Sequence, residues 1–208
     1  MNAESAEANF MKRIWLKLAI LAIVFLPSWA GNSMAASVRN CTWCHGTGAQ
    51  GYAVAPRLAG QRTAYIESQL RSYAAHIRDN PYSKQYMWGA AANLRTDTMR
   101  DLSDYFASLP PKAAHDGRRV LADRGQAIYV QGIPEANIVA CLACHGPSGQ
   151  GVREIPRLGG LSYFYLKRRL EEWHQGYHSA PESPMPMVAS TLGPDEIDAL
   201  ASYLSFVR

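Results

Sequence analysis

The chain of 208 residues has no strong excess of one charge, no glycine repeat and only one long apolar run. Its 21 basic and 17 acidic residues leave a formal charge of +4, which is too small to favour nucleic acid as a partner. An apolar content of 48% excludes a disordered chain, and the missing glycine period excludes a collagen-like one. A single apolar run also excludes a polytopic membrane protein. The composition is that of an ordinary globular protein.

The one apolar run has the pattern of an export signal. A short basic lead precedes residues 18–26, which are apolar without interruption, and a small-x-small sequence follows that ends at Ala35. We expect a signal peptide over residues 1–35, cleaved after Ala35 or, as a second choice, after Ala30. The alternative is a retained N-terminal anchor, although the run is shorter than the ~20 residues that a spanning helix needs. The sequence thus predicts a periplasmic protein, tied to the membrane only if this segment is retained or a partner holds it there.

The four cysteines lie in two units with identical spacing, residues 41–45 (CTWCH) and 141–145 (CLACH). A comparison of the chain with itself at an offset of 100, and later 98, continues to match. The matched positions include Pro56-Arg57-Leu58 with Pro156-Arg157-Leu158, Tyr65 with Tyr165, Met87 with Met185, Leu102 with Leu200, and Tyr105 with Tyr203. The mature chain is therefore a tandem duplication.

A polar segment with two prolines, residues 109–117, falls between the copies and is typical of a linker, which we place at residues 111–117. We expect a first domain over residues 36–110 and a second over 118–208. Each is shorter than 100 residues, and domains of this size usually need a staple, a metal or a cofactor for stability.

The apolar spacing in both copies is helical, and no alternating strand pattern of useful length is present. The fold class is thus predicted to be all-α. The expected helices cover 65–73, 99–106, 124–130, 161–173 and 197–204, the last beginning after Gly193 with Pro194 at its first position. Only five residues precede Cys41 in the mature chain, so the first copy lacks a counterpart of helix 124–130. We expect the second domain, a partner or the retained signal segment to cover the last helix of the first copy.

The C-x-x-C-H unit is an attachment signature for c-type haem, since two thiols on one helical turn reach both vinyl groups and the adjacent histidine reaches the iron. Cys41 and Cys44 would hold one haem and Cys141 and Cys144 a second. The alternatives are a disulfide within each pair, a redox-active C-x-x-C and one zinc site made by all four cysteines. A zinc site needs no histidine after each second cysteine, and a thioredoxin-like motif needs a βαβ context that is missing. Two covalent haems with His45 and His145 as iron ligands are therefore expected.

Met87 and Met185 are the candidates for the sixth iron ligand, since they occupy matching positions 42 and 40 residues after their histidines. Imidazole plus thioether ligation suits an electron-transfer haem and leaves no open position for a substrate. Methionine more often packs in a core, and Met187 is a rival ligand in the second copy.

Other residues are candidates for supporting contacts. The segments at Pro56 and Pro156, each eleven residues after a histidine, are expected to supply a carbonyl for the second ring nitrogen. Haem propionates need cations or hydrogen-bond donors. The candidate propionate contacts are Arg57, Arg157, Gln61, Tyr65, Tyr165 and Arg78.

Together these features resemble the cytochrome c4 family of exported di-haem cytochromes. The resemblance rests on CTWCHG and CLACHG, PRLAGQ and PRLGGL, the two methionines, and the closing helices DLSDYFASL and EIDALASYL. It implies two tandem class I cytochrome c domains, each wrapped around one covalent haem, with the histidines and methionines as axial ligands.

The resemblance also implies a carrier of single electrons between a respiratory donor and an acceptor such as a terminal oxidase, which is not itself an enzyme. The expected partners are redox proteins. A first rival is the electron-accepting subunit of a periplasmic dehydrogenase, because the first copy with its missing helix would lean on a partner. A second rival is a small haem peroxidase with one open iron.

Overall fold

The structure is a computed structural model that describes residues 29–177 and 183–208. Within these ranges every regular element is a helix, and strand-like pairing is limited to two isolated bridges, Ile133 with Ile138 and Val152 with Ile155. This confirms the all-α class. Residues 36–208 cluster as one unit that contains both repeats, and Met1–Ala35 forms another.

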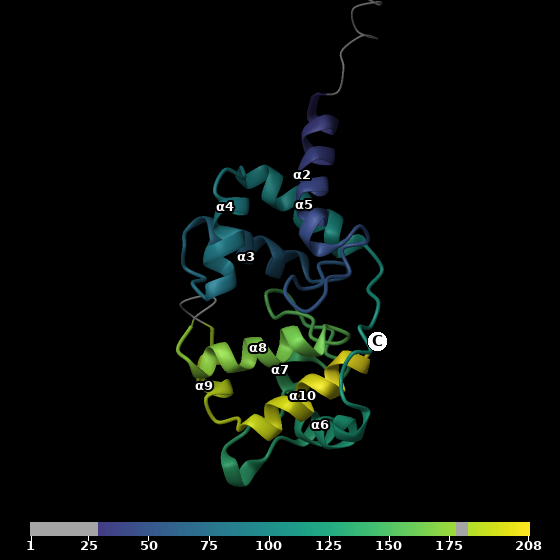
Figure 1. Cartoon of the computed structure of the whole chain (residues 1–208), viewed down its shortest axis with the longest axis vertical. Helices are drawn as coiled ribbons and strands as arrows, with labels where there is room; N and C mark the ends of the chain where they lie inside the picture. The colour runs from purple at the N-terminus through teal and green to yellow at the C-terminus, as the bar shows by residue number, and fades with distance from the viewer. Residues whose placement is uncertain (1–28, 178–182) are drawn as a thin grey trace, which may run out of the picture. The chain divides into compact units, whose positions relative to one another are not determined.

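The first repeat is built on a small group of helices around α3 and α5 (Figure 1). Its elements are α2 (Trp29–His45), α3 (Thr63–Ala74), the π-helix η1 (Ser83–Met87), α4 (Trp88–Ala91) and α5 (Thr96–Ser108). α3 packs against α4 and α5. The apolar stripe predicted for the last helix is buried at Met99, Leu102 and Phe106, because residues three and four apart share one face of a helix.

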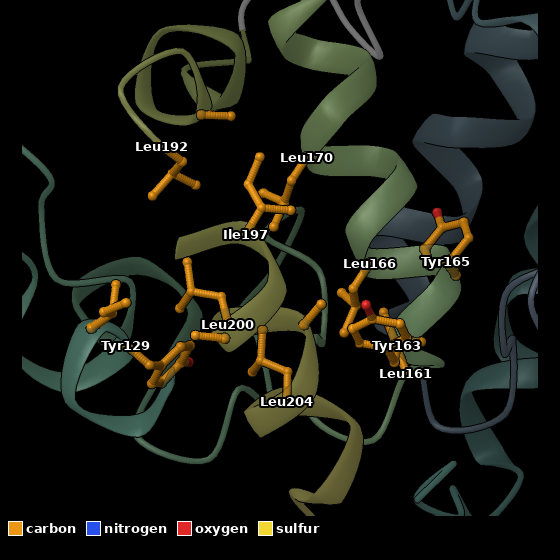
Figure 2. Close-up of a cluster of buried hydrophobic side chains, with 14 of the residues drawn as sticks. Tyr129, Leu161, Tyr163, Tyr165, Leu166, Leu170, Leu192, Ile197, Leu200 and Leu204 are labelled. Carbon is orange, nitrogen blue, oxygen red and sulfur yellow. The ribbon is translucent and has the colours of Figure 1, made fainter. Parts of the chain in front are cut away.

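The second repeat has a separate helix, α6, before its C-x-x-C-H unit. Its elements are α6 (Arg119–Gln131), the 3-10 turn η2 (Pro134–Ala136), α7 (Leu142–His145), α8 (Tyr163–His174), α9 (Met185–Ala189) and α10 (Pro194–Phe206). α10 packs against α6 and α8, and Figure 2 shows its leucines between Tyr129 of α6 and Leu166 of α8. α10 begins at Pro194 after an extended Gly193, as predicted.

Gly125 permits the close crossing of α6 over α10. A Cβ atom at this position would lie 2.0 Å from the carbonyl oxygen of Ala199 and 2.7 Å from Cβ of Tyr203. Because that oxygen belongs to a helical backbone, the two helices would have to separate to admit a side chain.

Replacing Gly125 with alanine is expected to lower the free energy of unfolding by about 1–3 kcal/mol, the usual cost of overpacking a core. Denaturant unfolding of the purified protein measures this change. Gly89→Ala is the matched control, since Gly89 lies in α4 and a Cβ there meets no atom within 4 Å. Equal stability of the two variants would contradict the tight crossing.

The last helix of the first repeat carries charged residues at positions that are buried in its counterpart. In α10 Ala199 lies against Gly125 of α6, and both Ala199 and Ser202 are fully buried. At the offset of 98 the matching residues of α5 are Asp101 and Asp104, and both are exposed. Carboxylates at these positions favour exposure to water, and Tyr105, which matches Tyr203 of α10, is 39% exposed on the same helix.

The segment between the repeats is held by hydrogen bonds to both of them. The amide of Lys112 donates to Oε1 of Gln50 at 2.9 Å, and the amide of Ala114 donates to the carbonyl of Gly160 at 3.1 Å. Asp116 accepts from the Tyr163 amide at the start of α8 at 2.8 Å. Although its composition is typical of a flexible linker, this segment is therefore bound to both repeats.

The predicted signal peptide lies mostly outside the described residues, which begin at Trp29. The described part starts α2, which passes both candidate cleavage sites, Ala30 and Ala35, and continues without a break into the first C-x-x-C-H unit. Among the described helices, none has the length and apolar character needed to cross a membrane.

Candidate haem-binding sites

Both C-x-x-C-H units present their thiols and histidine from one helical turn. Cys41, Cys44 and His45 end α2, and the second unit begins at the residue before α7. Residues at i, i+3 and i+4 share a helix face, so each set of three faces the same side. None of the four cysteines is joined in a disulfide. Burial raises the pKa of the Cys41 thiol, and it raises that of Cys141 to about 11.

These cysteines form neither disulfides nor one shared metal site. No group of three or more cysteine, histidine or carboxylate side chains with metal-binding geometry occurs in the described parts of the chain. The zinc alternative, which needs all four thiols together, therefore has no support in the arrangement.

Each histidine of the motif is buried and oriented by a proline carbonyl. His45 is 6% exposed and its Nδ1–H donates to the oxygen of Pro56 at 2.7 Å, while His145 is 5% exposed and donates to Pro156 at 2.9 Å. Burial lowers the pKa of both rings, although these hydrogen bonds partly oppose that effect. A neutral ring with Nδ1 protonated leaves Nε2 as the free lone pair that an iron ligand requires.

A glycine turn brings each proline carbonyl to its histidine. Gly51 donates its amide to the carbonyl of His45 at 2.9 Å and has a φ of +67°. A Cβ atom at Gly51 would lie 2.2 Å from the backbone nitrogen of Arg57, so only glycine permits this approach. Gly151 repeats the arrangement with a φ of +69°. The eleven-residue spacing in the sequence thus reflects a closed turn.

The candidate methionines lie in short helical turns. Met87 ends η1 and Met185 begins α9, and both are half-buried. Met185 packs against the apolar core of the second repeat, whereas Met187 is 73% exposed. π-helical turns are rare and often occur at functional sites.

Arg57, one of the expected propionate contacts, is bonded mainly to the protein. It is 4% exposed, and Nη1 donates to the carbonyls of Lys112 at 2.6 Å and Gly160 at 2.8 Å, while Nη2 donates to Gly159 at 2.6 Å. Burial, with a smaller contribution from Arg157, lowers its pKa to about 10. Arg57 therefore ties the first repeat to backbone of the linker and the second repeat.

Arg157 and Gln61 join the same contact between the repeats. Nε of Arg157 donates to the carbonyl of Gly60 at 3.3 Å, which mirrors the bond from Arg57 to Gly160. The Gln61 side chain donates to the Arg157 carbonyl at 2.9 Å and accepts from its amide at 2.7 Å. The duplicated Pro-Arg-Leu motif thus forms a nearly reciprocal contact.

Arg57→Leu is expected to lower the free energy of unfolding by about 3 kcal/mol, because it leaves the carbonyls of Lys112 and Gly159 without a donor in a largely buried region. Denaturant unfolding, followed through the haem absorbance, measures the loss. The exposed Arg62→Leu variant is the control and should change stability by less than about 0.5 kcal/mol. A loss no larger than that of the control would show that the contact adds nothing to stability.

The remaining candidates, Tyr65, Arg78 and Tyr165, come together in a second buried cluster. Nη1 of Arg78 donates to Oε1 of Gln69 at 2.7 Å, and Nη2 donates to the Tyr165 hydroxyl at 3.3 Å. Burial raises the pKa of Tyr65 to about 12. Burial also acts to raise the pKa of Tyr165, but the guanidinium groups of Arg78 and Arg169 outweigh it and lower that pKa. The cluster is therefore cationic.

Buried donors in this cluster have no acceptor in the protein, which fits an anionic ligand. Four such donors are found among the described residues: Arg78 Nε, Arg168 Nε, Arg169 Nη2 and Trp173 Nε1. Buried polar groups normally have partners, and haem propionates would supply carboxylate oxygens to these donors. The residues present therefore fit haem groups.

Arg169 was not among the residues singled out from the sequence. A signal was available, because Tyr165, Arg169 and Trp173 follow each other at four-residue intervals on α8. The same positions in the first repeat are Tyr65, Gln69 and Tyr73 of α3. A polar stripe repeated at the offset of 100 predicts a shared role.

Comparison with known proteins agrees with this arrangement. The family model for cytochrome c matches residues 31–110 and 122–207. A cytochrome c-552 of Acidithiobacillus ferridurans is 37% identical over 80% of this chain and 73% of its own length. A thiosulfate dehydrogenase electron acceptor of Stutzerimonas stutzeri is 36% identical over 80% of this chain and 78% of its own.

Solved structures give the same result. The cytochrome c4 of Acidithiobacillus ferrooxidans superposes with a TM-score of 0.74 at 35% identity, covering 80% of this chain and 98% of that one. Two C-x-x-C-H units within two cytochrome c domains mean two covalently bound haem c groups. The chain therefore belongs to the cytochrome c family, as a di-haem electron carrier of the cytochrome c4 kind.

Proposed function

We propose that this protein carries single electrons in the periplasm between a respiratory donor and an acceptor such as a terminal oxidase, and catalyses no reaction itself. The repetition of a complete ligand set supports this most strongly, since each repeat holds a buried, oriented histidine and a half-buried methionine. Two filled axial positions leave no site for a substrate.

Each proposed site residue has one task. Cys41 and Cys44, and likewise Cys141 and Cys144, form the thioethers to haem. His45 with Met87, and His145 with Met185, are the axial iron ligands. Arg169 and Trp173 join Arg78, Tyr65 and Tyr165 around the propionates, while Arg57, Arg157 and Gln61 hold the repeats together beside them. We assign residues 36–110 and 118–208 to the two domains and 111–117 to the linker.

When bound, haem supplies a one-electron couple whose potential depends on the ligands and their surroundings. The protein contributes the surroundings of the haem that set this potential. The Pro56 and Pro156 carbonyls fix the tautomer of each histidine, and methionine sulfur favours the reduced iron. The buried guanidinium groups compensate the charge of the propionates.

Export is part of the proposal. The basic lead, the apolar run and the small-x-small sequence ending at Ala35 support removal of residues 1–35. A retained segment would instead associate the protein with a membrane.

A second role, as the electron-accepting subunit of a periplasmic dehydrogenase, is favoured by one relative. The matched protein of Stutzerimonas stutzeri is a thiosulfate dehydrogenase electron acceptor, and 78% of its length aligns with this chain. The fold is the same for both roles, so only the partner separates them.

Native mass spectrometry of the protein from its own periplasmic and membrane fractions tests the two roles. A free chain that starts at Ala36 and carries two haems supports the soluble carrier. The same chain in a fixed stoichiometry with a larger subunit supports the dehydrogenase role. A chain that still carries residues 1–35 would contradict the proposed cleavage.

A further inference from the structure

The turn that carries Met87 is organised by a buried asparagine. Asn80 is 2% exposed, and its backbone carbonyl accepts from the Lys84 amide at 3.1 Å at the start of η1. Its side-chain oxygen accepts a short hydrogen bond from the Ser83 hydroxyl, and Ser83 is also 2% exposed. Since η1 ends at Met87, Asn80 fixes the beginning of the element that holds the proposed ligand.

The same asparagine is bonded to the other repeat. Its Nδ2 donates to Oε1 of Glu172 at 2.9 Å, and Glu172 belongs to α8. Glu172 is 4% exposed, pairs through Oε2 with Nη1 of Arg169, and lies 3.6 Å from Nε of Arg168. A carboxylate held by two guanidinium groups is a fixed acceptor, so Asn80 meets a rigid partner.

A second link ties the residue after Met87 to the same helix. Nε1 of Trp88 donates to the carbonyl of Arg78 at 2.9 Å, and the Arg78 guanidinium donates to the Tyr165 hydroxyl at 3.3 Å. Tyr165 and Glu172 are seven residues apart on α8 and therefore share a face. Figure 2 shows Tyr165 extending from α8 on the side away from Ile197 and Leu170. Met87 is thus bracketed by two connections to α8.

The methionine of the second repeat is held differently. The Met185 amide donates to Oγ of Ser183 at 3.4 Å, and His174 bonds to the Ala189 carbonyl at 3.3 Å through Nδ1. Both contacts lie within the second repeat, as far as residues 183–189 are described. Among residues 29–177 and 183–208, bonds to the neighbouring repeat are thus found for the turn that carries Met87 and not for the one that carries Met185.

We propose that Glu172, in the second repeat, is a positioning residue for Met87, so that the second repeat holds the sixth ligand of the first haem. The inference rests on the proposed role of Met87 as an iron ligand. Methionine sulfur is a weak ligand, and its occupancy depends on how firmly its segment is held. Loss of the Asn80–Glu172 bond frees that segment at one end while the haem stays attached through Cys41 and Cys44.

The sharpest variant is Asn80→Asp. The new carboxylate still accepts from Ser83 but cannot donate to Glu172, and it adds a second negative charge beside that buried carboxylate. In the double variant with Glu172→Gln, the new amide at position 172 can donate to the new carboxylate at position 80. The hydrogen bond is then restored in the reverse direction, and the summed charge of the two side chains equals that of the wild type. Glu171→Gln is the matched control, because Glu171 neighbours Glu172 but its partly exposed carboxylate pairs with Lys167 of the same helix.

The readout is the proton NMR spectrum of the reduced holoprotein, in which each iron-bound methionine gives a strongly upfield-shifted methyl signal. Met87→Ala assigns the signal of the first haem. We expect Asn80→Asp to weaken that signal alone, to lower one midpoint potential, and to increase the fraction of the first haem that binds carbon monoxide roughly tenfold. The double variant should regain the methionine signal, whereas Glu171→Gln should keep both signals unchanged.

Ser83→Ala provides a milder test if Asn80→Asp does not accumulate, since it removes only the hydroxyl that bonds to Asn80. It should weaken the same signal to a smaller extent. Wild-type methionine signals in Asn80→Asp, or failure of the double variant to restore them, would overturn the positioning role. If Met87→Ala itself removes no methionine signal, the ligand assignment is wrong, which is a separate result.

Discussion

Replacing Met185 with alanine is expected to leave both haems covalently attached and to lower one midpoint potential by on the order of 0.2 V, a fraction of the ~0.8 V that axial ligands span. The reason is that water or no ligand replaces the thioether, and the reduced iron loses the sulfur that favours it. Met87→Ala should act equally on the other haem. A spectroelectrochemical titration of each variant measures both potentials.

Met187→Ala is the control for this experiment. Met187 is two residues from Met185 and 73% exposed, so its loss should leave both potentials unchanged. If instead Met187→Ala lowers a potential and Met185→Ala does not, the sixth ligand of the second haem is Met187. That result would also require α9 to rearrange, since Met185 packs on the core.

Replacing Cys144 with alanine is expected to lower the covalent haem content from two to one per chain, as is Cys44→Ala. Each attachment turn uses both thiols, and Cys44 and Cys144 sit beside the ligating histidines. The affected repeat should also lose stability, because a domain of this size depends on its cofactor for a core. Mass spectrometry of the denatured protein counts the haems.

The double variant, with Cys44→Ala and Cys144→Ala, should carry no haem that is attached through two thioethers. Ser68→Ala, which changes a partly exposed hydroxyl on α3, should retain two haems. Two intact haems in Cys144→Ala would contradict the attachment proposed for the second repeat.

The helices were predictable because their signals are local. The stripe of Ile197, Leu200 and Leu204 and the proline start at Pro194 describe α10 without reference to any other part of the chain. The histidine partner was predictable as well, because a glycine turn closes the eleven residues from His45 to Pro56. Local spacing determines both features.

The contacts between the repeats could not be predicted in the same way. Comparing the chain with itself finds matching residues, but it does not show which of them touch. Arg57 and Arg157 each donate to a backbone carbonyl of the opposite repeat. The link from Asn80 to Glu172 does not follow from the repeat either, since the residue that matches Glu172 in the first repeat is Ser72, which has no carboxylate. Such a contact depends on how two domains pack, which periodicity does not encode.

The polar face of α5 could have been predicted from the sequence. At the offset of 98, Asp101 and Asp104 stand where α10 has Ala199 and Ser202. Two carboxylates in place of two small buried residues indicate a helix that faces water.

The central claim, a two-haem carrier with both irons fully ligated, is tested most directly by a reductive titration of the purified wild-type protein under carbon monoxide. The account predicts that each chain takes up two electrons in one-electron steps and that neither haem binds carbon monoxide in more than a small fraction of the molecules. Uptake of a single electron, or a carbon monoxide complex at one haem of the wild-type protein in stoichiometric amount, would contradict it and favour a haem enzyme with an open iron.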